Sequence, residues 1–201
     1  MQTVQLGQTG LTISRLGFGG IPIQRIDQPG TRALLKAAHE GGINYIDPAR
    51  AYTVSEAWIG QSLEELGLRD QFVLATKCRA LTAAELEENL AASLKALRTD
   101  HIELYQLHNP SLQDLEVILA PGGALEALRK AKAEGVVGHI GITAHLAAVF
   151  ERALDIPDFE TIMFPYNIVE QQGADLIERC ARSGKGFIDM KPLAGGAIED
   201  G

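Results

Sequence analysis

Short apolar stretches alternate with amphipathic stretches along most of the chain. The apolar stretches predict strands over residues 14–19, 43–46, 72–76, 102–107, 136–142, 161–164 and 186–190. The amphipathic stretches carry apolar residues three or four positions apart, and they predict helices over residues 31–40, 55–66, 82–97, 124–134, 146–154 and 174–183. Before the first of these strands, a glycine-containing turn at residues 7–10 predicts a β-hairpin.

The predicted strands are apolar at consecutive positions, which indicates that both of their faces are buried. Strands of this kind that alternate with helices form parallel β/α units, in a doubly wound open sheet or in a barrel. The sequence GFGG at residues 17–20 does not complete a dinucleotide-binding GxGxxG motif, because position 22 is proline. Polar residues end several strands and not only one pair, which favours the (β/α)8 TIM barrel.

Chemically active side chains end three successive predicted strands. Asp47 ends the second strand, Lys77 the third and His108 the fourth, and Tyr52 lies in the loop after the second. Each has a structural alternative: Asp47 as a cap, Lys77 reaching solvent along its own stem, His108 as a half-buried histidine and Tyr52 as a rim aromatic. Because neighbouring strands lie about 4.8 Å apart, we expect the four groups to converge at one rim of the barrel.

Composition narrows the classes of partner and compartment. The 201 residues carry a formal net charge of −8, without runs of Lys or Arg, which argues against nucleic acid and anionic membranes as partners. No apolar run approaches membrane-spanning length, and the first residues lack the apolar core of a signal peptide. Cys78 and Cys180 are far apart, which fits a reducing cytoplasm, and no Cys/His pair has the spacing of a zinc site. Oligomeric state cannot be inferred from these features.

Four segments, in chain order, resemble the aldo-keto reductase family. They read LGQTGLTISRLGFGG, GINYIDPARAYTVSEAWIGQSL, LATKCRA and LYQLHNP, and the resemblance extends along the whole chain. The resemblance implies an enzyme that reduces small aldehydes or ketones with hydride from NADPH, or alternatively from NADH. Carried over to this sequence, Asp47, Tyr52, Lys77 and His108 form the catalytic tetrad.

The residue types of this tetrad suit carbonyl reduction. Tyr52 would donate a proton to the developing alkoxide, although a free tyrosine has a pKa of about 10. We expect the Lys77 ammonium, within hydrogen-bond reach, to lower the pKa of Tyr52, and Asp47 to keep Lys77 charged. His108 would orient the carbonyl oxygen and donate a hydrogen bond to it.

The resemblance also assigns positions around the nicotinamide cofactor. Where the family commonly has Ser-Asn to hold the carboxamide, this chain has Thr143 and, two residues later, His145. Met163 occupies the position of a common glutamine, and Met190 that of the ring that stacks on the nicotinamide. The remaining cofactor candidates implied by the resemblance are Gly20, Ile21, Asp47, Lys191, Pro192 and Leu193.

The resemblance stops just after the seventh strand. We expect the family's eighth strand, last helix and adenosine-phosphate-binding motif to lie outside this sequence, so residues 1–201 are interpreted as one C-terminally truncated barrel domain. Such a chain would bind the cofactor weakly and could carry the tetrad without turnover. The MKPLAGG ending resembles a branch of the family that is followed by a ferredoxin-like iron–sulfur segment. This sequence contains no cysteine cluster to bind such a centre.

Two other functions remain open at this point. One is a regulatory barrel that senses nicotinamide without turnover, which the altered carboxamide positions favour. The other is an unrelated phosphate-binding barrel, for which the glycines of LAGG at residues 193–196 are a weak signal.

Overall fold

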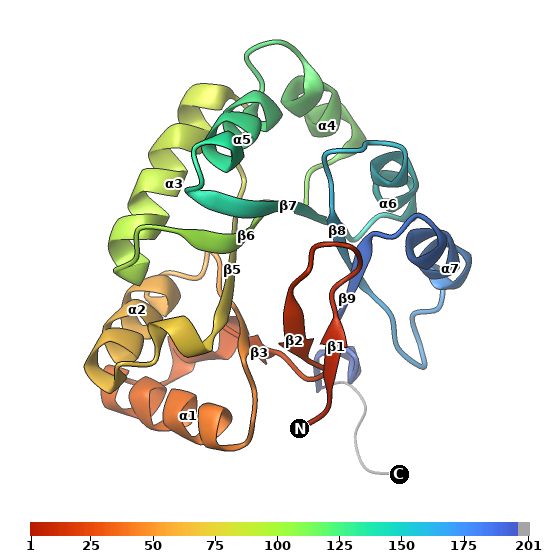
Figure 1. The fold of residues 1–201 in the computed structure, drawn as a ribbon. Coiled ribbons are helices and arrows are strands. Elements are labelled where there is room, and N and C mark those ends of the chain that lie inside the picture. Colours follow the sequence, from red (N-terminus) through yellow and green to blue (C-terminus); the bar gives the residue numbers. More distant parts are fainter. Residues whose placement is uncertain (197–201) are drawn as a thin grey trace.

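The structure is a computed structural model that describes residues 1–196. Seven parallel strands form one curled sheet in sequence order, with helices around its outside (Figure 1). The strands are β3 (Phe18–Gly19), β4 (Tyr45–Asp47), β5 (Val73–Cys78), β6 (Ile102–His108), β7 (Val137–Thr143), β8 (Thr161–Pro165) and β9 (Gly186–Met190). The helices are α1 (Gln28–Glu40), α2 (Ser55–Leu66), α3 (Ala83–Leu97), α4 (Leu112–Leu119), α5 (Ala124–Ala133), α6 (Ala147–Leu154) and α7 (Ala174–Arg182), with short 3-10 turns at Ile21–Arg25, Arg69–Gln71 and Ala194–Gly196.

This arrangement confirms the predicted barrel class with its seven strands and outer helices. Within residues 1–196, β3 and β9 end the sheet and do not pair with each other. The predicted domain range extends to residue 201, and its last five positions lie outside the described residues. Among the described helices, none combines the length and the apolar character needed to cross a bilayer.

Two elements differ from their predictions. The strand predicted over residues 14–19 is divided, because Ser14 belongs to the hairpin and its hydroxyl donates to the carbonyl of Leu16, which turns the chain before β3. Helix α4 was not predicted, although Ser111 and Asp114 form a capping box at its start. The equivalent box of Thr82 and Glu85 at the start of α3 is present as predicted.

The strand residues alternate between two apolar clusters. Ile46, Leu74 and Ile140 face outward and pack with the helices, whereas Tyr45 and Leu104 face into the barrel. This alternation follows from the opposite directions of successive side chains in a strand. It places every second residue of each strand end at the barrel's inner face.

The N-terminal hairpin closes the end of the barrel where the strands begin. Its strands are β1 (Thr3–Gln5) and β2 (Thr12–Ser14), and Leu6, just after β1, and Ile13 of β2 belong to the inward cluster. Its turn contacts the start of β9, where a Cβ on Gly7 would lie 2.3 Å from the Gly186 nitrogen. Because Gly7 also has a φ of +56°, only glycine fits this contact without displacement.

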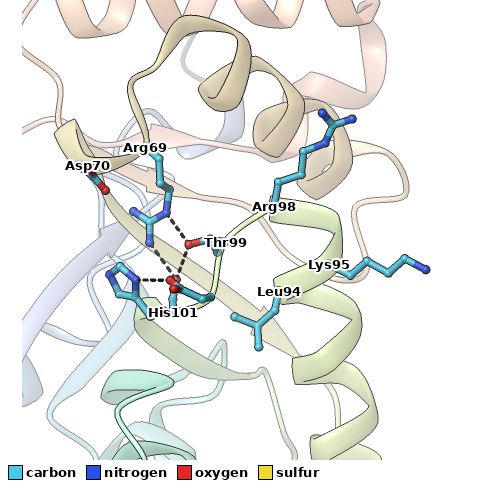
Figure 2. Close-up of a pocket in the computed structure, with 8 residues that line it drawn as sticks. Arg69, Asp70, Leu94, Lys95, Arg98, Thr99 and His101 are labelled. Carbon is cyan, nitrogen blue, oxygen red and sulfur yellow. Dashed lines mark hydrogen bonds and ion pairs between the residues drawn. The ribbon is translucent and has the colours of Figure 1, made fainter.

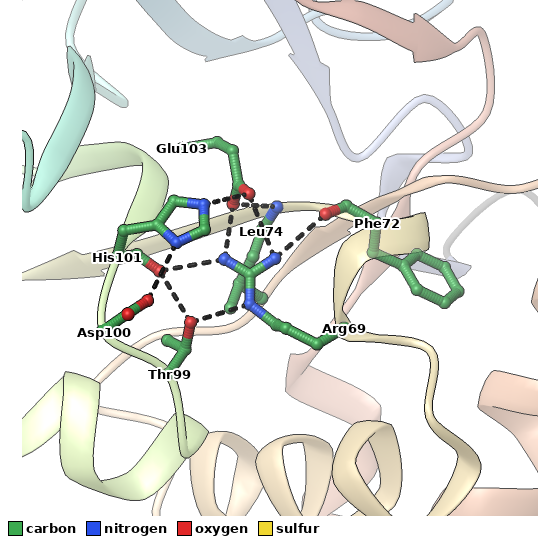
Figure 3. Close-up of polar contacts among 7 residues, drawn as sticks. All are labelled: Arg69, Phe72, Leu74, Thr99, Asp100, His101 and Glu103. Atoms are coloured by element: carbon green, nitrogen blue, oxygen red, sulfur yellow. Dashed lines mark hydrogen bonds and ion pairs between the residues drawn. The ribbon is translucent and has the colours of Figure 1, made fainter.

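A polar network around Arg69 joins the starts of β5 and β6 at the same end (Figure 3). The Arg69 guanidinium donates to both carboxylate oxygens of Glu103, at 3.1 and 2.9 Å, and to Thr99 Oγ1 at 2.9 Å. It also donates to the carbonyls of Phe72 and His101, so its donors are all engaged. Glu103 in turn accepts from the Leu74 backbone nitrogen at 2.9 Å.

Three residues of this network, Arg69, Thr99 and His101, line a groove of about 570 Å³ beside the start of β6 (Figure 2). The groove carries both charge signs, and its other arginine, Arg98, is paired with Glu64. Because all Arg69 donors already bond to backbone and side-chain acceptors, we infer that this end of the barrel stabilises the fold and does not bind a ligand.

We expect Arg69→Met to lower the free energy of unfolding by about 2–4 kcal/mol, because it leaves Glu103 as a mostly buried carboxylate without its partner. Urea denaturation measures this change. Arg98→Met, which removes an exposed pair at the same groove, is the matched control with an expected loss below about 1 kcal/mol. Equal losses for the two variants would contradict the structural role given to Arg69.

Candidate active site

The inward-facing positions at the strand ends form two successive levels. Lys77 of β5 is in register with Gln106 of β6, and Gln106 with Gly141 of β7. One level further along, His108 is in register with Thr143. The carboxyl ends of the strands therefore present Lys77 and His108 to the same side of the sheet, as their sequence positions predict.

A buried ion pair lies at the centre of this mouth. Lys77 is only 3% exposed, and its Nζ donates to Asp47 Oδ2 at 2.5 Å and to the Pro48 carbonyl at 2.9 Å. Gln106 Nε2 donates to the second carboxylate oxygen, Asp47 Oδ1, at 2.8 Å. Asp47 is thus held from two strands, and the third Nζ proton of Lys77 has no protein acceptor among the described residues.

Tyr52 lies beside this pair on the loop between β4 and α2. The Lys77 Nζ is 5.4 Å from the centroid of the Tyr52 ring, and the Tyr52 and His108 rings meet edge-on with centroids 5.8 Å apart. Two contacts hold the loop: Arg50 pairs with buried Glu56 at 2.7 Å, and Thr53 donates to Gln24 at 3.0 Å. The structure therefore brings all four tetrad candidates together.

The protonation of Tyr52 differs from our expectation. Burial, and then the negative charge of Asp47, raise the pKa of Tyr52 to about 12, while the charge of Arg79 opposes this shift. The expected lowering by Lys77 is wrong for this structure, because the Lys77 ammonium donates to Asp47 and Pro48 and no hydrogen bond joins it to the Tyr52 hydroxyl. At neutral pH the phenol is fully protonated.

His108 is neutral at physiological pH. Burial lowers its pKa to about 4, and the charges of Lys77, Arg79 and His145 act in the same direction. Its Nδ1 is buried without a hydrogen-bond partner among the described residues. A neutral imidazole keeps one N–H, so His108 can still donate to a carbonyl oxygen.

Thr143 and His145 lie at the end of β7, held by one residue that sequence reasoning missed. The Asn109 backbone nitrogen donates to Thr143 Oγ1 at 2.9 Å, and its side-chain oxygen accepts from the His145 nitrogen at 3.0 Å. Asn109 has a φ of +54°, a left-handed conformation that asparagine tolerates better than most residues. The asparagine after a strand-ending histidine was the available signal.

The other cofactor candidates also lie at this rim. Met163 is buried and pairs with Thr143 along the β7–β8 ladder, while Met190 ends β9. Lys191 has a φ of +61°, and its carbonyl accepts from Asn167 at 3.1 Å. Beyond them the chain turns at Pro192 and exposes Leu193.

Gly20 and Ile21 approach the mouth from the opposite side. The Gly20 nitrogen donates to the Asp47 carbonyl at 3.0 Å, and a Cβ on Gly20 would lie 2.7 Å from the Pro48 Cα. Glycine is therefore required for β3 to lie this close to the strand end that carries Asp47. Ile21, the first residue of the following 3-10 turn, is exposed.

Gln106 is the second residue at the centre of the mouth that the sequence did not reveal. It is fully buried in β6, two residues before His108. A glutamine inside an otherwise apolar strand was the signal, since a buried amide needs a partner. Cys78 behaves as alternation predicts: it faces outward into the core, and burial raises the pKa of its thiol.

Comparisons with known proteins identify relatives. Residues 15–201 match the model of the Aldo/keto reductase family. The chain is 29% identical to L-galactose dehydrogenase of Arabidopsis thaliana and 28% identical to the NADH-specific methylglyoxal reductase of Escherichia coli, covering 97% and 98% of this chain and 66% and 69% of those proteins. An aldo-keto reductase of Bacillus halodurans, solved in its holo form, superposes with a TM-score of 0.87 at 29% identity, covering 98% of this chain and 68% of that one.

The chain spans about two thirds of the length of the curated relatives it matches, with values of 66% and 60% for two of them. The match nevertheless includes all seven parallel strands and every residue of the candidate site.

We expect the His108 ring to titrate near pH 4 and not near its ordinary value of about 6.5, as measured by NMR. Because the folded pKa lies below the unfolded one, the protein should lose stability as pH falls from about 6.5 to about 4. His108→Gln is the control, since it should lose that part of the pH dependence in urea denaturation. A His108 midpoint near 6.5 would contradict the buried, cation-flanked setting described here.

Proposed function

Since the chain belongs to the aldo/keto reductase family, we propose that it carries the catalytic centre of an oxidoreductase that reduces aldehyde or ketone carbonyls with hydride from NADPH. The observation that supports this most is the buried Lys77–Asp47 pair with Tyr52 and His108 beside it. The residues assigned to catalysis are these four.

Tyr52 is the proton donor in this proposal. With a pKa of about 12, Tyr52 keeps its proton at neutral pH, so the proton is available for transfer in every turnover. An alkoxide is a stronger base than a phenolate, so proton transfer from Tyr52 to the reduced oxygen is downhill in spite of the raised pKa. Transfer is then driven by the base that the reaction creates, not by an acidic resting phenol.

Lys77 stabilises the phenolate that remains after this transfer. Its Nζ lies over the Tyr52 ring and keeps one proton free of protein acceptors, so it can turn toward the new negative charge. Asp47 is the counter-ion of the lysine in its buried setting, and Gln106 fixes the carboxylate.

His108 positions the substrate. Its neutral imidazole has a buried Nδ1 without a partner, so we place its proton on Nε2, where it can donate to the carbonyl oxygen. In this position His108 polarises the carbonyl without competing with Tyr52 as an acid.

The residues at the ends of β7 to β9 fit a nicotinamide dinucleotide in chemical type. Thr143 and His145 offer polar groups for a carboxamide, Met163 and Met190 offer apolar contact, and Lys191 offers a charge for a phosphate. When bound, the reduced nicotinamide supplies the hydride. We propose NADPH on the family expectation, and the name of one relative as NADH-specific makes NADH the necessary comparison.

Oxidation of NADPH and of NADH by the full chain, with a panel of aldehydes and ketones, tests the proposed function. We expect aldehyde-dependent loss of the reduced nicotinamide absorbance. If both nucleotides bind, as measured by fluorescence, but no carbonyl compound is reduced, the nicotinamide-sensing alternative is supported and the enzymatic proposal fails.

Tyr52→Phe should lower kcat for carbonyl reduction by about 10²- to 10⁴-fold and leave nicotinamide binding intact, because it removes only the proton donor. Lys77→Met should be at least as harmful. Thr53→Ser changes the same loop but keeps the hydroxyl that donates to Gln24, and it should keep most of the activity. Steady-state kinetics and fluorescence titration measure both effects, and unchanged turnover in Tyr52→Phe would exclude Tyr52 from the mechanism.

A further inference from the structure

Arg79 occupies the next inward-facing position after Lys77 in the chain that leaves β5. Lys77 pairs with Gln106 and Cys78 with Leu107, so the residue after Cys78 lies level with His108. Cys78 faces outward into the core, and strand alternation directs Arg79 toward the same side as Lys77. Arg79 is exposed, and it lines a small cavity of about 60 Å³ with His108 and Asn109 and with the outward-facing Cys78 and Leu107.

The Arg79 charge has no counter-ion within the described part of the chain. The other arginines, apart from Arg25, contact a carboxylate or an amide oxygen: Arg15, Arg32, Arg50, Arg69, Arg98, Arg129, Arg152, Arg179 and Arg182. The carboxylate that shares the cavity, Asp114, instead accepts from Ser111 at the start of α4. The chain has a formal charge of −8, and most of its arginines are paired. Within the described residues, Arg79 at the mouth therefore differs from most other arginines in having no partner.

This guanidinium acts on both groups that would contact a carbonyl. The pKa of Tyr52 is raised chiefly by burial and Asp47, and Arg79 opposes that shift. The pKa of His108 is lowered chiefly by burial, and Arg79 adds to Lys77 in the same direction. The positive charge of Arg79 therefore lowers the pKa of both Tyr52 and His108.

We propose that Arg79 binds an anionic group of the substrate, so that the preferred substrates are aldehydes or ketones that carry a carboxylate or a phosphate. This inference rests on the proposed function, because it assumes that the carbonyl lies between Tyr52 and His108. A guanidinium matches both anions with paired N–H donors, and an exposed one without a partner loses no existing contact on binding them.

The position of Arg79 favours the substrate over the cofactor as the source of this anion. Arg79 follows β5. In the sheet, β5 lies between β4, which precedes Tyr52, and β6, which ends in His108. The cofactor candidates Thr143, Met163 and Lys191 lie in or just after β7, β8 and β9, on the other side of His108, whereas Gly20 and Ile21 follow β3. Lys191, the charged candidate for a cofactor phosphate, is therefore separated from Arg79 by several strands, and we assign the anion at Arg79 to the substrate.

The test compares 4-carboxybenzaldehyde with 4-methylbenzaldehyde, which are similar in size and differ in charge. We expect the ratio of their kcat/KM values to fall by about 10- to 100-fold in Arg79→Met, which is the range for a lost hydrogen-bonded charge pair, and to recover in part in Arg79→Lys. The ratio cancels any effect of Arg79 on Tyr52 or His108, because both aldehydes use the same acid. Arg25→Met is the matched control, since Arg25 also lacks a partner within the described residues, and it should keep the wild-type ratio.

An unchanged ratio in Arg79→Met would overturn the proposal, and so would a rise in the KM for NADPH without a change in the ratio. Binding of the alcohol products, 4-carboxybenzyl and 4-methylbenzyl alcohol, to the wild type and to Arg79→Met is measured by calorimetry in parallel. If the wild type reduces neither aldehyde but prefers the carboxylated alcohol in an Arg79-dependent way, the proposed function fails and the anion site stands. If binding shows no such preference, the anion site fails whatever the turnover.

Discussion

The Lys77–Asp47 ion pair is the constraint on which the candidate site depends. An ammonium that is only 3% exposed cannot keep its charge without a counter-ion, and Asp47 on the neighbouring strand supplies it at 2.5 Å. Gln106 from β6 holds the other carboxylate oxygen, so three successive strands fix one charged group. Tyr52 and His108 are then arranged around a lysine whose position cannot drift.

The same pair explains why the phenol is not acidic at rest. Burial disfavours a phenolate at Tyr52, and the negative charge of the Asp47 carboxylate acts in the same direction. The site therefore holds a protonated donor and a neutral imidazole, both set by desolvation more than by any single neighbouring charge. In the mechanism that we propose, Lys77 contributes most when negative charge develops on Tyr52, so its effect belongs to the reaction and not to the resting protein.

The two ends of the barrel have different roles: one stabilises the fold, and the other carries the candidate site. Where the strands begin, Arg69 is saturated by Glu103 and by backbone carbonyls, and the hairpin packs its apolar residues against the inward cluster. Where the strands end, Arg79 lacks a partner within the described residues, and the third Nζ proton of Lys77 lacks a protein acceptor. The groove at the beginning of β6 is larger than the cavity beside Arg79 and His108, but it is less informative about function.

The sequence by itself determined the order of the strands, the barrel class and the placement of Asp47, Lys77 and His108 at strand ends, because periodicity and residue type are local properties. It did not determine that Ser14 belongs to the hairpin, that Gln106 holds Asp47 or that Asn109 bridges to Thr143 and His145. Only the tertiary structure decided the pKa of Tyr52, because that value depends on burial and on charges from segments far apart in the chain. Pairing between distant residues is set by distance in the folded molecule, which no pattern along the sequence records.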